Sequence, residues 1–341
     1  MFSFLKYRTY PIGVDVGRDS LKLAQLGNNG KGIHLIAGGI ENRPADVKLG
    51  SGDWQRWVIE AIRKLIANGK FRGRNIVAAI PASEVFIDQI KVPQTPESDD
   101  WKPDDAIFSK IKQKLPFEAE DAMIKYIPTE RDNILIIATE RKIIDRHLAI
   151  YEKTNLAIKS IGVWPVALTN SYTSFFGRRK ADIEAIVMLL EIEASCTNVV
   201  ICRHRNLLFA RSIPIGAEQL NRKKALETLL SSTSHVRTLQ YVADSSPSYD
   251  GDAVTGLVLE LTACRRHFGS MYKRAQIERL IFLSGQTVDR DICGTIAEQL
   301  EIPAQIGDCL AAVEIEDAYH LGIDRRGCRV NLATAFGLSL S

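Results

Sequence analysis

The chain has 341 residues, of which 45% are hydrophobic and 25% are charged, and its formal net charge at pH 7 is +3. This composition is typical of a globular protein, and the length predicts two lobes of about 150 residues, or one lobe with an insertion. The net charge is small, and Lys and Arg are scattered among acidic residues without a basic cluster. Both observations argue against a nucleic-acid-binding protein. No apolar run approaches the ~18 residues of a bilayer-spanning helix, so we expect no transmembrane segment.

The six cysteines form no CxxC pair and lack the clustered spacing of a zinc site. In a sequence without an export signal, they are interpreted as reduced thiols of a cytoplasmic protein. None lies beside a base in the sequence, so we assign no catalytic residue among them.

The first part of the chain predicts three strands, one helix and a further strand. The strands fall at residues 11–16, 20–26 and 32–41, followed by a helix at 53–69 whose apolar residues recur at helical spacing. Residues 75–81, NIVAAIP, then predict a buried strand.

From Val85 the pattern changes to short amphipathic elements. Strands are predicted at 85–93, 123–130, 133–141 and 157–164, and helices at 104–117 and 142–155. Their order is that of a compact β-α-β-β-α-β unit, which we interpret as an insertion in the first lobe.

A helix at 166–176 leads into a second run of three strands, at 183–192, 197–204 and 207–216. Helices at 255–275 and 291–300, strands at 277–285 and 302–307, and a last helix near 331–340 complete the chain. Because the three-strand pattern occurs twice with helices between, the sequence predicts two related α/β lobes that face a cleft.

A similar turn opens each lobe. In GVDVGRDSLKL (13–23) and LEIEASCTNVV (190–200), an apolar strand ends at an acidic residue, Asp15 or Glu191, and a hydroxyl residue, Ser20 or Thr197, opens the next strand. Backbone N–H groups of such turns can bind an anion, and a carboxylate such as Asp15 can hold hydrated Mg²⁺. Gly17 permits close approach because it has no Cβ. The paired turns therefore predict phosphate loops.

These turns, the insertion, GVWPVAL (162–168), SIPIGAEQL (212–220) and the ending ATAFGLSL (333–340) together resemble the actin-like ATPase superfamily, most closely its PilM type IV pilus assembly family. The resemblance implies an actin-like (ribonuclease H-like) two-lobe α/β fold of FtsA/PilM type, with an inserted small β-α-β-β-α-β subdomain. The implied boundaries are 1–84 for the first lobe, completed by 161–178 and 325–341, then 85–160 for the insertion and 179–324 for the second lobe, including a helical subdomain at about 222–275.

The motif match to the family also places a site for ATP and Mg²⁺, with Asp15 as the metal ligand. The first phosphate loop falls on Asp15, Gly17, Arg18, Asp19, Ser20 and Lys22. The second falls on Glu191, Glu193, Ala194, Ser195 and Thr197, and the adenosine-side turn on Ser284, Gly285 and Gln286.

Three of these elements depart from the family pattern. Glu193 replaces a glycine and adds a carboxylate where phosphate oxygens would lie, and like charges ~4 Å apart repel by about 4 kcal/mol at an effective dielectric of ~20. A Glu193 side chain turned outward to solvent would avoid this repulsion. Gln286 also replaces a glycine, and Gly162 and Trp164 stand where acids are usual. We therefore expect weak or absent binding of ATP and Mg²⁺, and absent or very slow ATP turnover.

The function implied by the resemblance is that of a cytoplasmic scaffold, peripheral at the inner membrane, that binds the N-terminal tail of an inner-membrane PilN-like protein. The groove would lie between the first lobe and the insertion, near residues 85–93 and 104–117. An active actin-like ATPase and a GspL-like type II secretion component remain alternatives, and self-association stays open.

Overall fold

The computed structural model describes residues 8–91, 103–130, 132–176, 180–221, 249–273, 275–283, 288–310, 313–315 and 331–341. Residues 222–248 of the expected helical subdomain lie outside this part of the chain, and so does the expected adenosine-side turn at Ser284, Gly285 and Gln286. Within the described residues, no helix is both long and apolar enough to cross a membrane.

The first lobe is built on a six-stranded sheet in the order β14-β3-β2-β1-β4-β8. Its strands are β1 Arg8–Val16, β2 Ser20–Asn28, β3 Ile33–Asn42, β4 Asn75–Ile80, β8 Ala157–Val163 and β14 Glu314–Ile315. β1, β2 and β3 are antiparallel, whereas β4 and β8 extend the sheet in parallel from β1. The three early strands and the helix after them are as the sequence predicts.

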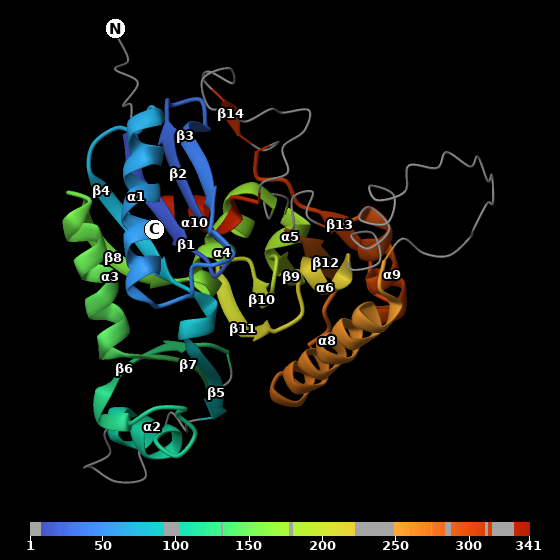
Figure 1. The fold of residues 1–341 in the computed structure, drawn as a ribbon. Helices are drawn as coiled ribbons and strands as arrows, with labels where there is room; N and C mark the ends of the chain where they lie inside the picture. Colours follow the sequence, from blue (N-terminus) through green and yellow to red (C-terminus); the bar gives the residue numbers. More distant parts are fainter. Residues whose placement is uncertain are drawn as a thin grey trace, which may run out of the picture.

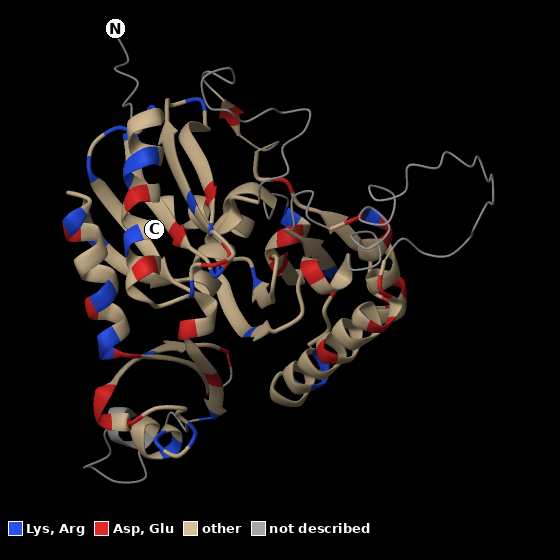
Figure 2. Cartoon of the chain, viewed as in Figure 1, with Lys and Arg blue, Asp and Glu red and all other residues tan. Residues whose placement is uncertain are grey.

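Helix α1, Gly52–Asn68, covers this sheet because its apolar residues form one face (Figure 1). The Ser51 side chain caps the helix by accepting from the Trp54 N–H at 3.1 Å, and the chain leaves it at Gly69. Trp54, Val58 and Ile62 are buried in the core of the first lobe. Along α1 and α3, acidic and basic residues alternate without forming a face of one sign (Figure 2).

The second lobe repeats the strand order of the first. Its sheet, β11-β10-β9-β12-β13, again has three antiparallel strands followed by two parallel ones. The strands are β9 Ile186–Ile192, β10 Thr197–Arg203, β11 Asn206–Ile213, β12 Arg279–Phe282 and β13 Ala304–Ile306. Helices α5 Lys180–Glu184, α6 Ala217–Leu220, α8 Gly251–Met271 and α9 Arg290–Leu300 belong to this half. The shared topology confirms that the two halves are related in architecture.

Helices α4, Trp164–Ser171, and α10, Ala333–Ser339, lie between the two sheets (Figure 1). One core cluster joins side chains from both sheets, including Leu26 and Leu189, with Phe336 of α10. The backbones approach closely here. A Cβ on Gly337 would lie 1.8 Å from the carbonyl oxygen of Ala167 in α4. Glycine at this position is therefore required for the packing of α10 against α4.

The inserted unit contains a three-stranded sheet in the order β5-β7-β6. Its elements are β5 Phe86–Lys91, α2 Pro103–Ile111, β6 Ala122–Pro128, β7 Asn133–Glu140 and α3 Arg141–Lys153, with short 3-10 turns at Ala82–Glu84 and Ala119–Asp121. The order β-α-β-β-α-β is as expected, but the last strand, β8, was wrongly assigned to this unit. It pairs in parallel with β4 of the first lobe, because α3 packs against α1 and returns the chain to that sheet.

The inserted unit is also held by the second lobe. The Gln89 side-chain amide of β5 donates to the carbonyl oxygen of Leu208 and to the hydroxyl of Tyr272, at 2.7 Å each. Thr129 and Tyr272 share a hydrogen bond of 2.6 Å, and Arg203 pairs with Glu130 at 2.6 Å. Side chains of β5 and of the β6–β7 turn thus contact the second lobe, and β5 and β6 form the two edges of the small sheet.

Candidate functional site in the interlobe cleft

The two turns expected to bind phosphate face one another across the cleft and have matching backbone geometry. Gly17 donates its N–H to the carbonyl oxygen of Ser20, and Glu193 donates its N–H to that of Cys196, both at 2.9 Å. Gly17 and Glu193 therefore occupy equivalent places in the two turns. The difference between them is a side chain, and that side chain is a carboxylate.

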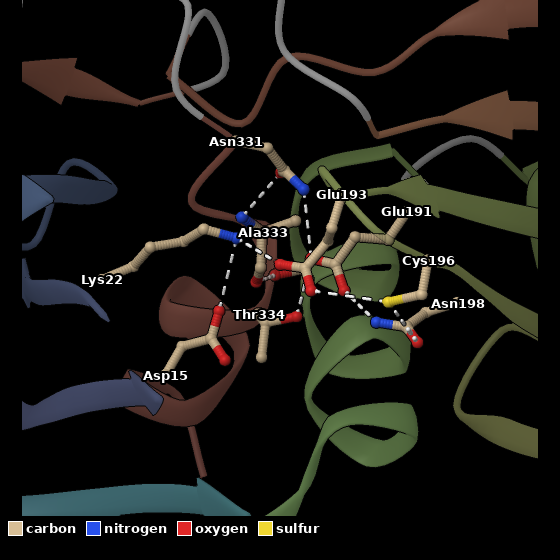
Figure 3. A network of polar contacts seen from close by, with 10 residues as sticks. Asp15, Lys22, Glu191, Glu193, Cys196, Asn198, Asn331, Ala333 and Thr334 are labelled. Carbon is tan, nitrogen blue, oxygen red and sulfur yellow. Dashed lines mark hydrogen bonds and ion pairs between the residues drawn. The ribbon is translucent and has the colours of Figure 1, made fainter. Parts of the chain in front are cut away.

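The Glu193 carboxylate points into the cleft and binds Lys22 of the first lobe (Figure 3). The Lys22 ammonium donates to Oε1 of Glu193 at 2.6 Å and lies 3.6 Å from Oδ2 of Asp15. The exposed fractions of the three side chains are 7% for Lys22, 14% for Glu193 and 10% for Asp15. The outward, solvated orientation of Glu193 is therefore not the one observed.

A second hydrogen bond crosses the cleft beside this ion pair. The Ser195 hydroxyl of the second turn donates to Oδ2 of Asp19 in the first turn at 2.6 Å. Asp19 is in turn 3.6 Å from Arg43, whose guanidinium also donates to the carbonyl oxygen of Arg18. Four of the residues assigned to phosphate binding thus bind one another: Asp19, Lys22, Glu193 and Ser195.

Glu191 is buried beneath the second turn and accepts three hydrogen bonds. Its Oε1 accepts from the Thr334 hydroxyl at 2.8 Å and from the Asn331 amide at 3.0 Å, and its Oε2 accepts from the Asn198 amide at 3.1 Å. Thr334 is in α10 and Asn331 precedes it, so Glu191 connects β9 to the segment that packs on the first lobe (Figure 3). Glu191 therefore has a structural role.

Burial and mutual charge shift the pKa values of this cluster. The pKa of Asp15 is raised to about 6. Burial is the largest cause, the charge of Glu193 acts in the same direction, and the attraction of Lys22 opposes both. Burial, with the nearby charge of Glu193, raises the pKa of Glu191 to about 7. Burial alone would lower the pKa of Lys22, but Glu193, Asp15 and Glu191 outweigh burial and hold that pKa above its usual value. Lys22 is therefore a fixed positive charge among carboxyl groups.

Next to both turns is a cavity of about 400 Å³ that reaches the inserted unit. It is lined by Arg18, Glu193 and Ser195 of the turns, by the chain leaving β4 and entering β5, and by Arg211 of β11. Arg211 is already paired with Glu260 at 2.9 Å. The cavity therefore adjoins all three parts of the molecule.

A model of the type IV pilus assembly protein PilM family matches residues 13–341 of the chain. The chain belongs to this family. Among solved structures, a "PilM-PilN type IV pilus biogenesis complex" is 18% identical, with 97% of this chain and 98% of that chain covered and a TM-score of 0.71. The two-lobe actin-like fold expected from the sequence is thereby confirmed.

Other solved structures are more distant. EutJ from Carboxydothermus hydrogenoformans is 12% identical, covering 97% of this chain and 89% of its own, with a TM-score of 0.49. The cytoplasmic domain of EpsL, an inner-membrane component of the type II secretion system of Vibrio cholerae, is 8% identical, covering 98% and 95%, with a TM-score of 0.46. A search of curated proteins finds no match.

In this member of the PilM family, the chain's own side chains occupy the expected phosphate end of the cleft. The Glu193 oxygens lie 3.7 and 3.8 Å from where a Cβ on Gly17 would be, so they cover the glycine that a phosphate would approach. Lys22 is bound to Glu193, and Asp15 faces Lys22. No group of three or more His, Cys, Asp or Glu residues suited to a metal occurs within the described ranges.

Of the remaining assigned residues, Thr197, Ala194 and Ser20 make hydrogen bonds within or next to the turns. The Thr197 hydroxyl donates to the carbonyl oxygen of Ile215 at 2.7 Å, and the Ala194 carbonyl accepts from the N–H of Glu218 at 2.9 Å. The Ser20 carbonyl closes the first turn, and Arg18 is exposed. The sequence assigned no role to Asn198, Asn331 and Thr334, although Thr334 lies in the ending that supports the family resemblance.

Two threonine hydroxyls, in α4 and in the π-helical turn Tyr172–Phe176 that follows it, donate hydrogen bonds to backbone carbonyls. Thr169 donates to Pro165 at 2.8 Å and Thr173 donates to Thr169 at 2.9 Å. Trp164, where the family pattern has acids, is buried. Along this segment the structure thus offers no carboxylate to orient a water for phosphoryl transfer.

Proposed function

We propose that this protein is a non-catalytic cytoplasmic scaffold of a type IV pilus, which binds the cytoplasmic tail of a PilN-like inner-membrane protein. Membership of the PilM family and the likeness to a PilM-PilN complex over nearly all of both chains support this proposal. The protein would then reach the inner membrane through its partner.

The observation that carries the docking part of the proposal is the character of the β6 edge. Large apolar side chains are exposed on β6 and on α2 of the inserted unit. Met123 and Tyr126 of β6 are 40% and 42% exposed, and Phe108 of α2 is 39% exposed. Met123 and Tyr126 lie on opposite faces of the strand, so they flank the edge. An extended peptide added to such an edge gains backbone hydrogen bonds and contacts with side chains on both faces.

Binding of the tail peptide is expected to weaken at least ~10-fold, about 1.4 kcal/mol, when Met123 and Tyr126 are both replaced by glutamate, since the charges oppose apolar docking. Titration calorimetry with the synthetic cytoplasmic tail of the PilN-like protein measures this change. Leu259→Glu on α8 is the matched control, because Leu259 is apolar and 66% exposed but belongs to the second lobe. Unchanged affinity in the double variant would rule out the β6 edge.

Point variants are preferable to deletion of the inserted unit. The boundaries 85–160 remain a prediction, and a deletion to residue 160 would remove α3 and part of β8. Both contribute to the first lobe: Ile150 and Tyr151 of α3 lie in its core, and β8 pairs with β4. Loss of binding after such a deletion would not separate docking from misfolding.

The second part of the proposal is a degenerate nucleotide site. Calorimetric titration with Mg-ATP is expected to show no micromolar affinity, because the Glu193 carboxylate would repel the phosphates and already holds the Lys22 ammonium. Competition with a fluorescent ATP analogue provides an independent check. A dissociation constant of micromolar or tighter would contradict this part of the proposal and favour the alternative of an active ATPase.

A further inference from the structure

The feature that leads beyond the proposed function is that the chain's own groups bridge the cleft. Glu193 and Ser195 of the second turn bind Lys22 and Asp19 of the first, and Glu191 binds Thr334 of α10. In a two-lobe fold, any group that contacts both turns stabilises the arrangement in which the turns are close together. Here no external ligand is needed to make those contacts.

We propose that Glu193 is an internal ligand of Lys22, and that this ion pair holds the two lobes closed in place of a bound phosphate. The carboxylate has the charge of a phosphate oxygen, lies over Gly17, and binds the ammonium at 2.6 Å. The glycine of the family pattern has no such side chain. The replacement therefore adds an interaction between the lobes as well as removing space for a ligand.

Burial makes this pair specific for one arrangement. Lys22 and Glu193 are largely removed from solvent, so separating the turns would either rehydrate both groups or leave one of them unpaired. Asp15, at 3.6 Å, is a weaker second partner for Lys22 because it makes no hydrogen bond to it. The hydrogen bond from the Ser195 hydroxyl to the Asp19 carboxylate contributes in the same direction, but only one of its two partners is charged, so closure depends mainly on Glu193.

Amide hydrogen exchange of the full-length protein tests the proposal. In Glu193→Gln, which keeps the shape of the side chain and removes its charge, exchange in the peptides covering 17–22 and 193–198 is expected to rise at least ~10-fold. Ser195→Ala is expected to give a smaller rise in the same two peptides. Saturating Mg-ATP is expected to leave exchange in the wild-type protein unchanged.

The matched control is Glu130→Gln, which removes the pair between Glu130 and Arg203. That pair also has a 2.6 Å separation and also involves the second lobe, but it reaches the inserted unit and not the first turn. It is expected to leave exchange at both turns unchanged. Wild-type exchange rates at the turns of Glu193→Gln, or an equal rise in the control, would overturn the proposal. If Mg-ATP protected the wild-type turns and Glu193→Gln still showed the expected rise, the degenerate nucleotide site would be contradicted. The role of the Lys22–Glu193 pair in holding the two turns together would still be supported.

Discussion

Replacing Gly337 with alanine should lower the free energy of unfolding by about 3 kcal/mol or more. The added Cβ would lie 1.8 Å from the Ala167 carbonyl oxygen and 2.4 Å from its carbon, both of which are backbone atoms of α4. Relief requires α10 to move away from α4, and α10 also packs against β1, where a Cβ on Gly13 would meet the Ala335 oxygen at 2.0 Å. Urea denaturation followed by circular dichroism measures the loss.

Gly294→Ala in α9 provides a control of opposite sign. A Cβ at Gly294 would meet no atom within 4 Å, and this glycine is inside a helix. Alanine is the better helix former by about 0.5–1 kcal/mol, so this variant should be slightly more stable than the wild type. If Gly337→Ala were as stable as the wild type, α10 and α4 would not pack as closely as described.

The second large effect is expected for Lys22→Met. This change leaves Asp15, Glu191 and Glu193 in a buried cluster without their shared cation, and removal of one partner from a buried pair typically costs about 3–5 kcal/mol. The variant should therefore lose this much free energy of unfolding at pH 7.5. Urea denaturation at that pH measures the loss. Stability close to that of the wild type would show that the Lys22 ammonium does not stabilise the buried carboxyl groups.

The control for charge loss is Lys64→Met. Lys64 pairs with Glu41 at 2.8 Å, but its side chain is 59% exposed, so solvent screens the pair. Exposed pairs contribute at most about 1 kcal/mol, and the control should be close to the wild type. The difference between the two lysine variants then isolates the effect of burial.

Much of the architecture was predictable because it depends on local patterns. Most strands of the two lobes, together with α1 and α9, follow from apolar periodicity. The repeated turn pattern correctly predicted that Asp15 and Glu191 lie at equivalent positions, at the end of the first strand of each hairpin. The assignment of β8 to the inserted unit was wrong because a strand's pattern does not identify its partner, and pairing with β4 depends on how α3 packs.

The sequence by itself determined the family, the two-lobe fold and the presence of a carboxylate at position 193. Only the tertiary structure decided the orientation of that carboxylate, since the position of Lys22, 171 residues away, depends on how the lobes meet. The same holds for Glu191, whose partners Asn331 and Thr334 come from the end of the chain. The physical reason is that side-chain charge and local periodicity are properties of short segments, whereas the pairing of buried groups is fixed by long-range packing.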